Sequence, residues 1–295
     1  TSDKVTGKIV GEYDVSDDAM VYLSYSKGFK PGGSNLTFGF TEAEDVIAER
    51  PVAPAMVFPT YESETIEAFE LGLKTDLLDG KARANIALFT YDYSNLQFQA
   101  TDPDPYRGGV ANIPESEMSG LEVELQALFS DNLSMDLNLA FLDSEVTSDY
   151  EVLDNVDAYQ YFFGEEDLRY GLRENVKGNE LAKSPEFTAD LNLVYETELS
   201  SGNEFTGIVQ FVRRGEFQQR VSNNPSVDAI KAYDIFNLTA SFELVKENIG
   251  VDFMLLNIAD EGGVNSSMTD VFGVAATGLE YIPPRQFMVR IRREF

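Results

Sequence analysis

Cysteine, histidine and tryptophan are all absent from this 295-residue sequence. The lack of cysteine excludes disulfides and thiol nucleophiles, and the lack of histidine excludes every imidazole base. Zinc sites of the usual kind are excluded too, because they are built mainly from these two residue types. Glu122 and Glu124 share one face of a predicted strand, but nothing around them implies a substrate cleft. We therefore expect no enzyme activity, with no catalytic residue, no metal ligand and no cofactor.

Positive charge is scarce, since 22 Lys and Arg stand against 51 Asp and Glu and give a net charge of −29. This sign argues against nucleic acid as a partner, because phosphates need a basic surface. It also argues against docking on anionic lipid through a basic patch. Apolar residues make up 43% of the chain, which is enough to exclude wholesale disorder.

Long apolar runs are also missing. No stretch approaches the roughly 18 apolar residues of a membrane helix. The first ten residues, TSDKVTGKIV, lack the apolar core of a signal peptide. A membrane β-barrel escapes this test, because its strands cross with about ten residues of alternating polarity.

Alternation of polar and apolar residues is the dominant pattern. In residues 65–77, Leu71 and Leu73 alternate with Glu70 and Lys74, and the Asp-Gly pair that follows is a strong hairpin signal. The same unit recurs and predicts eleven strands. They are expected at about 5–13, 19–29, 65–77, 82–99, 118–129, 134–146, 186–197, 205–216, 232–244, 249–258 and 285–295.

The connections between these strands alternate in length. Short links are expected at 14–19, 78–81, 130–133, 198–204 and 245–248, and long ones at 30–64, 100–117, 147–184, 217–231 and 259–284. Outer-membrane barrels have short periplasmic turns and long external loops, whereas a soluble sandwich has no reason for this order. The pattern predicts an all-β fold, an antiparallel transmembrane β-barrel segment with apolar rows toward lipid and polar rows toward a lumen. The alternative is a one-sided sheet packed on a second sheet, as in a soluble carbohydrate-binding or adhesion module.

Strand parity bears on the domain organisation. If the short links are periplasmic, Phe295 ends in the periplasm while Thr1 starts outside. Single-chain bacterial barrels have even strand numbers, and an open half-barrel would expose two unpaired edges to lipid. We therefore predict that residues 1–295 form one barrel domain, the C-terminal part of a longer chain.

Six stretches carry a family likeness: VYLSYSKGFKPGG at 21–33, ESETIEAFELGLKTDLLDGKARANIALFTYDYSNLQ at 62–97, SGLEVELQALFSDNLSMDLNLAFLDSE at 119–145, GNELAKSPEFTADLNLVYE at 178–196, LNIAD at 256–260 and the terminal strand ending in Phe295. In these stretches the chain resembles the C-terminal half of the barrel of TonB-dependent receptors. Members of that family import ferric siderophores and similar scarce solutes across the outer membrane. The resemblance implies a 22-stranded barrel, a plug domain in the same full-length chain, and a TonB box upstream of Thr1 that contacts the TonB complex. A passive outer-membrane diffusion channel is the alternative function.

The resemblance also implies roles for particular residues. A terminal strand with this pattern is read by the barrel-assembly machinery, and its candidate residues are Phe287, Val289, Ile291 and Phe295. The residues expected to face the lumen, toward plug or solute or simply toward water, are Glu70, Lys74, Glu122, Glu124, Asp136 and Asn138. The residues that could contact an anionic iron chelate are Lys30, Tyr106, Arg107 and Arg169, the last three in long loops. Lipid and lipopolysaccharide would surround the wall. Acidic loop clusters, such as Glu42, Glu44 and Asp45, read as solvated surface rather than cation sites.

Overall fold

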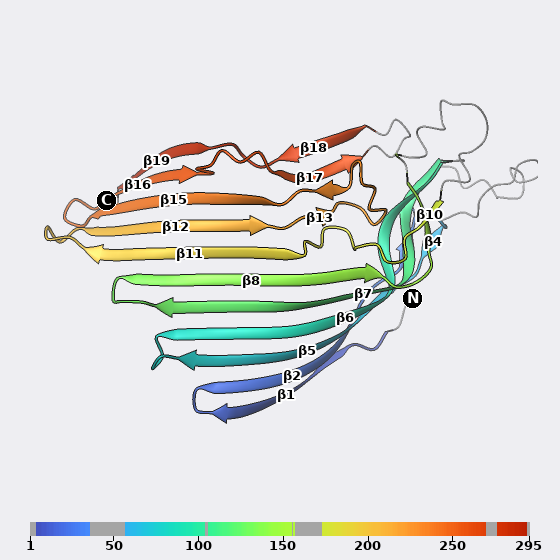
Figure 1. The fold of residues 1–295 in the computed structure, drawn as a ribbon, viewed down its shortest axis with the longest axis horizontal. Helices are drawn as coiled ribbons and strands as arrows, with labels where there is room; N and C mark the ends of the chain where they lie inside the picture. Colours follow the sequence, from blue (N-terminus) through green and yellow to red (C-terminus); the bar gives the residue numbers. More distant parts are fainter. Residues whose placement is uncertain are drawn as a thin grey trace, which may run out of the picture.

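The computed structural model describes residues 4–35, 57–103, 106–154, 156, 173–269 and 276–293, with only the backbone at 101–103, 106 and 107. Its main element is an 11-stranded antiparallel sheet (Figure 1). The strands are, in sheet order, β1 (Gly7–Ser16), β2 (Ala19–Lys30), β5 (Glu64–Leu77), β6 (Ala82–Pro103), β7 (Tyr106–Leu128), β8 (Leu133–Val146), β11 (Phe187–Glu198), β12 (Glu204–Arg214), β15 (Tyr233–Leu244), β16 (Ile249–Leu256) and β19 (Gln286–Arg293). Each corresponds to one of the eleven predicted strands, so the all-β prediction is confirmed.

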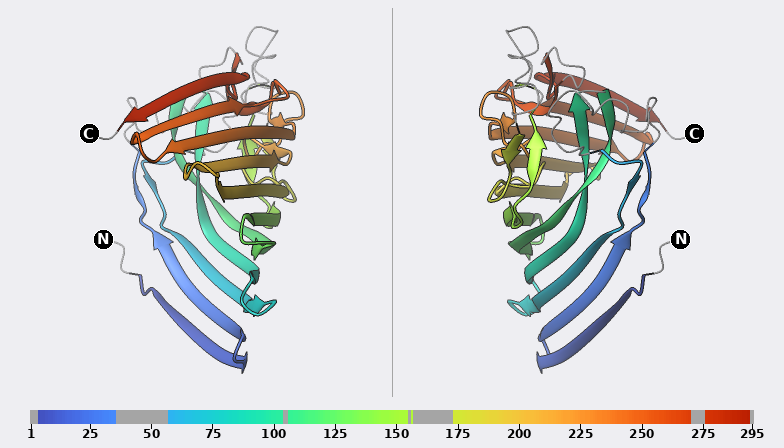
Figure 2. Two further views of the ribbon diagram at one scale, coloured as in Figure 1. Left: turned by 90° about the vertical axis from the view of Figure 1, so that its left-hand side faces the viewer. Right: turned by 90° about the vertical axis from the view of Figure 1, so that its right-hand side faces the viewer.

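Strands that follow one another along the chain are also neighbours in the sheet, and the sheet curls strongly (Figure 2). β1 and β19 form its two edges, and within the described residues neither has a strand partner on its outer side. Among those residues, too, no helix has the length and hydropathy to cross a membrane. The architecture is that of a wall rather than of two packed sheets.

Short turns join the strands at one end of the wall (Figure 1). In the turn between β5 and β6, Leu78, Asp79 and Gly80 all have positive φ, at 56°, 56° and 81°. Successive positive φ values are typical of hairpin turns whose twist matches that of the strands, and glycine adopts them without steric cost. The predicted Asp-Gly turn is therefore confirmed.

The opposite end carries the long connections, and four of these contain small two-stranded ladders. The ladders are β3 (Gly33–Ser34) with β4 (Thr60–Tyr61), β9 (Glu151–Leu153) with β10 (Arg173–Asn175), β13 (Phe217–Gln218) with β14 (Ala229–Ile230), and β17 (Val264–Thr269) with β18 (Thr277–Tyr281). The sequence pattern predicted none of them.

The predicted long loop at 100–117 is wrong, because β6 and β7 continue as a paired hairpin through nearly all of it. The pairing is interrupted at Asn95 and Pro114. Pro114 has no N–H for the ladder, and Asn95 has a φ of 57°. Asn112 Nδ2 donates to the Asn95 carbonyl at 2.8 Å and so satisfies that acceptor. The hairpin thus bends here and then runs on.

The continuation is stabilised by burial at the end of the wall that carries the small hairpins. An apolar cluster there includes Ala111 and Ile113 of β7 and residues from several long connections. We call this cluster the external core, after the external loops that the sequence predicts at this end. Its buried members are Val57, Ala100, Ala111, Ile113, Val146, Val152, Val176, Leu181 and Val221.

Candidate functional site

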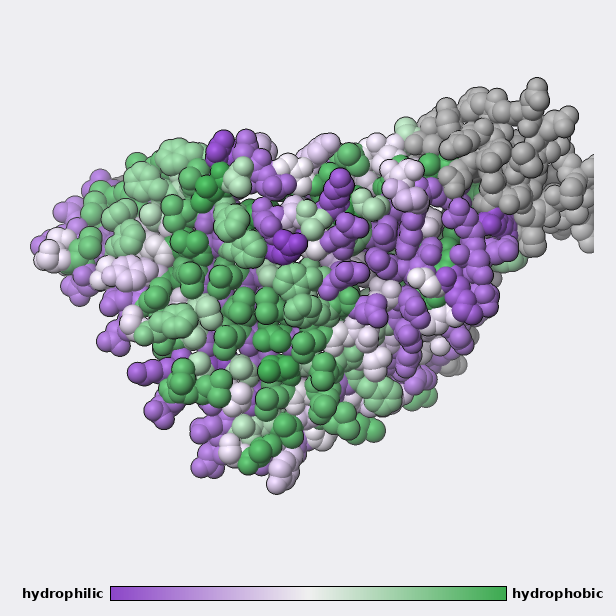
Figure 3. Space-filling model, viewed as in Figure 1, coloured by the Kyte–Doolittle hydropathy of each residue, from purple (hydrophilic) through white to green (hydrophobic). Residues whose placement is uncertain are grey.

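One face of the wall is an exposed apolar surface. The register places Leu23, Leu71, Leu88 and Leu121 in one row across β2, β5, β6 and β7. Leu71 and Leu88 are each 53% exposed, which is far more than a core leucine would be. Figure 3 shows hydrophobic residues gathered over the strands and hydrophilic ones toward the end with the small hairpins. Monomeric soluble proteins rarely expose apolar surface on this scale, so this face is suited to hydrocarbon.

Aromatic pairs flank this apolar face toward both ends of the strands. At the end with the small hairpins, Tyr25–Phe69, Phe141–Phe187 and Phe211–Phe236 have ring centroids 4.8, 4.8 and 4.9 Å apart. Near the turns, Phe205 packs on Phe242 at 4.9 Å and on Tyr195 at 6.5 Å. From Phe187 to Tyr195 the strand advances roughly 26 Å at about 3.3 Å per residue. Allowing for tilt, two aromatic levels at this spacing are typical of the interfaces of an outer membrane.

The opposite face is polar, and it holds all six residues predicted to line a lumen. Lys74, Asn85, Glu124 and Asn138 form one rung of it, and Asn85 Nδ2 donates to Glu124 Oε2 at 3.0 Å. The register assigns Glu70, Glu122 and Asp136 to the same face as this rung. The Lys74 ammonium lies 5.7 Å from the centroid of the Tyr22 ring.

A chain of amide hydrogen bonds crosses three strands on this polar face, β11, β12 and β15, and ends at Asn257, just after β16. Asn192 Nδ2 and Gln210 Nε2 donate to the two carboxylate oxygens of Asp190, at 2.5 and 3.1 Å. Asn237 Nδ2 donates to Gln210 Oε1 at 2.9 Å, and the Asn257 backbone N–H donates to Asn237 Oδ1 at 2.8 Å. The amide side chains therefore satisfy one another around a single charge. Sequence reasoning missed this chain, although Asn and Gln at polar strand positions are its visible signal.

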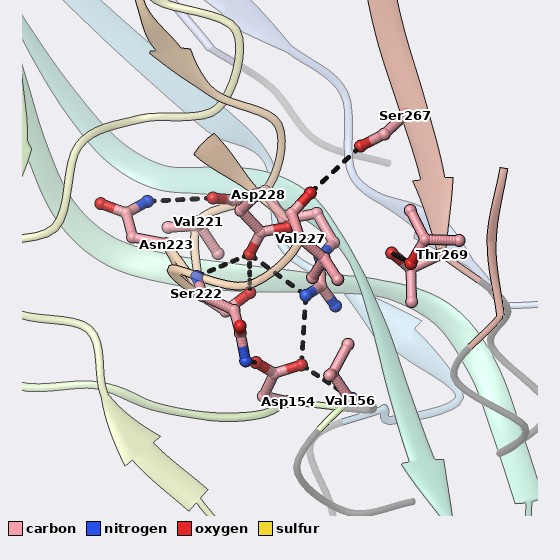
Figure 4. A network of polar contacts seen from close by, with 12 residues as sticks. Asp154, Val156, Val221, Ser222, Asn223, Val227, Asp228, Ser267 and Thr269 are labelled. Atoms are coloured by element: carbon pink, nitrogen blue, oxygen red, sulfur yellow. Dashed lines mark hydrogen bonds and ion pairs between the residues drawn. The ribbon is translucent and has the colours of Figure 1, made fainter. Parts of the chain in front are cut away.

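A network of polar contacts joins two of the long connections, beside the external core (Figure 4). Arg220 lies between Asp154 and Asp228, whose side chains are both 0% exposed. Its Nε donates to Asp228 Oδ1 at 2.6 Å, and its Nη2 reaches Asp228 Oδ2 and Asp154 Oδ1, each at 3.1 Å. Asn224 Nδ2 donates to Asp154 at 2.5 Å, and Ser222 Oγ donates to Asp228 at 2.9 Å. We call these five residues the Arg220 network.

Every carboxylate oxygen of the Arg220 network accepts at least one hydrogen bond. Buried charges are tolerated only when they are paired and hydrogen-bonded in this way. Within the part of the chain that the structure describes, no group of three or more acidic residues is placed to hold a metal ion. The network therefore fixes Asp154 to segment 220–228.

Glu180, near the Arg220 network, has a raised pKa. Burial is the main cause, and the negative charges of Glu186, Glu216 and Asp143 add to it. Its backbone N–H donates to Asn223 Oδ1 at 2.8 Å, so Glu180 lies directly beside the segment that carries the Arg220 network.

The remaining predicted residues are placed as follows. Phe287, Val289 and Ile291 lie on the apolar face of β19, opposite Leu255, Phe253 and Val251 of β16, and Phe295 lies outside the described residues. Lys30 ends β2. The prediction that Tyr106 and Arg107 lie in a long loop is wrong, because the backbone of both belongs to β7. Their Gly-rich, Pro-rich surroundings read as a loop, but cross-strand pairing outweighs that local preference. Arg169 and the acidic cluster at 42–45 lie outside the described residues.

Comparison with known proteins agrees with this geometry. A family model described as TonB dependent receptor-like, beta-barrel, matches residues 1–258. The protein named "Probable TonB-dependent siderophore receptor PiuA" of Acinetobacter baumannii is 30% identical over 146 residues, which are 50% of this chain and 18% of that protein. The pesticin receptor of Yersinia pestis is 27% identical over 153 residues, which are 51% of this chain and 20% of the receptor.

Solved structures show the same fold. The ferric yersiniabactin uptake receptor FyuA from Yersinia pestis superposes with a TM-score of 0.74 at 16% identity, covering 99% of this chain and 37% of FyuA. The siderophore receptor PiuA from Acinetobacter baumannii gives 0.67 at 19% identity, with 97% and 35% covered. This chain therefore spans less than two fifths of those proteins.

The exposed apolar face, the two aromatic levels and the order of strands define an outer-membrane β-barrel wall. With the family model matching most of its length, the chain belongs to the TonB-dependent receptor β-barrel family, whose members are receptors and transporters rather than enzymes.

Proposed function

We propose that this chain is the C-terminal part of the barrel of a longer outer-membrane receptor, and that the whole receptor imports a scarce solute with energy from TonB. A ferric siderophore is the solute class that the relatives' names favour. The observation that carries the proposal is the eleven-stranded wall, apolar on one face between two aromatic levels and matched by the family model. This segment supplies wall and external connections, and a plug domain of the same chain fills the lumen that the polar face lines.

The orientation follows from the two ends of the wall. Short turns face the periplasm in outer-membrane barrels, so the small hairpins and the external core lie outside the cell. The last strand then runs toward the periplasm and leaves the C-terminus there. The assembly machinery reads Phe287, Val289, Ile291 and Phe295, and outer-membrane lipid with lipopolysaccharide surrounds the wall. The candidates for contact with the solute remain Lys30, Tyr106, Arg107 and Arg169. Movement of the plug, driven by TonB, would then release the bound solute.

The test uses the full-length gene in a strain that lacks its own siderophore receptors. Uptake of iron-55 is measured with a panel of ferric siderophores, and uptake of labelled vitamin B12 and oligosaccharides is measured in parallel. Each assay is run in energised cells, in cells treated with a protonophore, and in a strain without TonB. We expect uptake of at least one ferric siderophore that is saturable and is lost in both de-energised conditions.

Two controls separate the rival functions. Uptake that rises linearly with solute concentration and persists without TonB would identify a passive diffusion channel and refute the proposal. Recovery of the protein in the soluble fraction, without detergent, would instead identify a soluble binding or adhesion module.

A further inference from the structure

The apolar face does not fix the register of the last strand, β19, against β16, because a shift of two residues would leave the apolar contacts equally good. In the observed register, Val251 of β16 is opposite Ile291 of β19, and Phe253 is opposite Val289. If β19 slipped by two residues, Val251 would meet Val289 and Phe253 would meet Phe287, and both pairs would again be apolar. Because side chains alternate with a period of two, a two-residue slip keeps every residue on its original face. Burial against lipid therefore does not choose between the two registers.

The polar face of the same strand pair does distinguish them. Asp252 of β16 is 1% exposed and lies opposite Arg290 of β19. Arg290 Nε donates to Asp252 Oδ2 at 2.6 Å, and Arg292 Nη2 lies 3.4 Å from Asp252 Oδ1. Arg292 also pairs with Glu243 of β15. Two arginines of the last strand are thus held by carboxylates of the two preceding strands.

Gly250 leaves the space that this arrangement needs. It lies between Glu243 and Arg292 in the register of the three strands. A Cβ at this position would come within 2.7 Å of Glu243 Oε1 and 2.8 Å of Arg292 Nη2. A larger residue would force these two flexible side-chain ends to shift, so the glycine lets the ion pair pass directly over the backbone of β16.

A slip in either direction would break this set of charges. In one direction Met288 would face Asp252. Arg290 would then face Gly250, where Arg292 now lies, so one arginine would remain for the two carboxylates. In the other direction Arg292 would face Asp252, and Glu243 would lose its partner. In either slipped register the buried Asp252 would keep one arginine instead of two, and removing a partner from a buried ion pair is costly.

A second set of contacts fixes the other end of the same strand pair. Asn257 Nδ2 donates to the Pro283 carbonyl at 3.0 Å, just before β19 begins. The Arg285 backbone N–H donates to Asp260 Oδ1 at 2.9 Å, and Arg285 Nη1 donates to the Ile258 carbonyl at 3.2 Å. These contacts come from the LNIAD stretch, so its polar residues hold the start of β19 in place.

We infer that Arg290 and Arg292 select the register of the last strand through Asp252 and Glu243, and that they act with the LNIAD contacts at its other end. The terminal strand then carries two kinds of information. Its apolar face provides the surface for lipid and, by the proposed function, the assembly signal. Its polar face determines which residues pair when the strand joins the sheet. The inference rests on the proposed function only in assuming that the chain is part of an outer-membrane barrel. It does not depend on which solute is transported.

Cysteine cross-linking tests this directly, because the 295-residue sequence contains no cysteine of its own. The full-length receptor is expressed in outer membranes with one of three cysteine pairs and oxidised there. Val251→Cys with Ile291→Cys reports the observed register, and Val251→Cys with Val289→Cys reports the slipped one. Leu255→Cys with Phe287→Cys reports the end held by the LNIAD contacts. Residues two rungs apart are too distant for an unstrained disulfide, so the pairs discriminate.

Each cysteine pair is combined with Arg290→Gln/Arg292→Gln. We expect the yield at 251–291 to fall about tenfold, since each lost hydrogen bond joins charged groups. The yield at 255–287 should fall with it, because the slip moves Phe287 opposite Phe253. The yield at 251–289 should rise correspondingly. Arg290→Lys/Arg292→Lys keeps both charges and should restore most of the 251–291 product. If the double glutamine variant does not fold, Arg290→Gln alone leaves Arg292 on Asp252 and should give a smaller change of the same kind.

The matched control is Arg213→Gln, which removes an arginine–carboxylate pair with Asp234 between β12 and β15, away from the last strand. It should leave all three yields unchanged. The inference is overturned if the 251–291 product persists in the double glutamine variant. It is equally overturned if that product disappears with no gain at 251–289, because the arginines would then hold the strand without choosing its register. A failure of the transport proposal would leave these yields unaffected, so the two ideas fail separately.

Discussion

Replacing Arg220 by methionine should open the external region without unfolding the wall. Arg220 is the only arginine in the Arg220 network, and it contacts two carboxylates that are both fully buried. Methionine fills much of the arginine stem but carries no charge. Breaking a buried ion pair by removing one partner typically costs about 3–5 kcal/mol.

The lower end of that range applies here. Asp228 would keep hydrogen bonds from Ser222 Oγ and from the Asn224 N–H, at 2.9 and 2.7 Å. Asp154 would keep those from Asn224 Nδ2 and from the Val156 N–H, at 2.5 and 2.9 Å. The Arg220 side chain is also 26% exposed, so water screens part of its charge. We therefore expect a loss of about 3 kcal/mol in the free energy of local opening.

Native-state hydrogen exchange on the purified full-length receptor measures this loss. Useful reporters are the N–H groups of Lys183, Gln219 and Val176, which donate to Gln218, Asp228 and Tyr150 at 2.7, 2.8 and 2.9 Å. A loss of about 3 kcal/mol corresponds to exchange roughly 150-fold faster at these amides, at tenfold per 1.4 kcal/mol. Amides in the β11–β12 ladder should exchange at their original rate.

Two further variants check the cause. Arg220→Lys keeps the charge but cannot bridge both carboxylates with a planar fork, so its effect should be intermediate. Adding Asp154→Asn and Asp228→Asn to Arg220→Met removes the buried charges as well and should restore part of the protection. If the reporter amides of Arg220→Met exchange within about threefold of their original rate, the reasoning is refuted. It is also refuted if the amides of the β11–β12 ladder accelerate as much as the reporters do.

Three more outcomes are expected. Leu88→Arg, on the apolar face, should destabilise the folded barrel by about 2–4 kcal/mol in urea unfolding. Asn138→Arg, on the polar face, should cost less than about 1 kcal/mol in the same assay. Equal losses in the two variants would contradict the assignment of faces. Gly120→Val should cost about 1–3 kcal/mol in the same assay, because a Cβ there would lie 2.6 Å from the Phe141 carbonyl oxygen. An unchanged urea midpoint would show instead that neighbouring strands move apart at no cost. The raised pKa of Glu180 gives stability that is present below the ordinary glutamate pKa and lost as pH rises through the raised value. The external region should therefore be less protected from exchange at about pH 7 than at about pH 4; in Glu180→Gln this difference should shrink, and an undiminished difference would assign it to other groups.

The sequence by itself determined the wall. Alternation with a period of two is a local property, and it is readable because one face meets hydrocarbon while the other stays polar. Leu71 and Leu88, which lie in separate predicted strands, are opposite each other as the pattern requires. The Asp79-Gly80 turn was equally readable, because positive φ at these positions has a local residue preference.

Tertiary structure alone decided the external end. Residues 106–117 look like a loop by composition, yet they form a strand because Ala111 and Ile113 are buried against segments distant in sequence. Asp154 and Arg220 are likewise far apart along the chain, and no local pattern predicts that they meet. Such contacts depend on how several long connections fold over one another, and their energies appear only once the surrounding groups have excluded water.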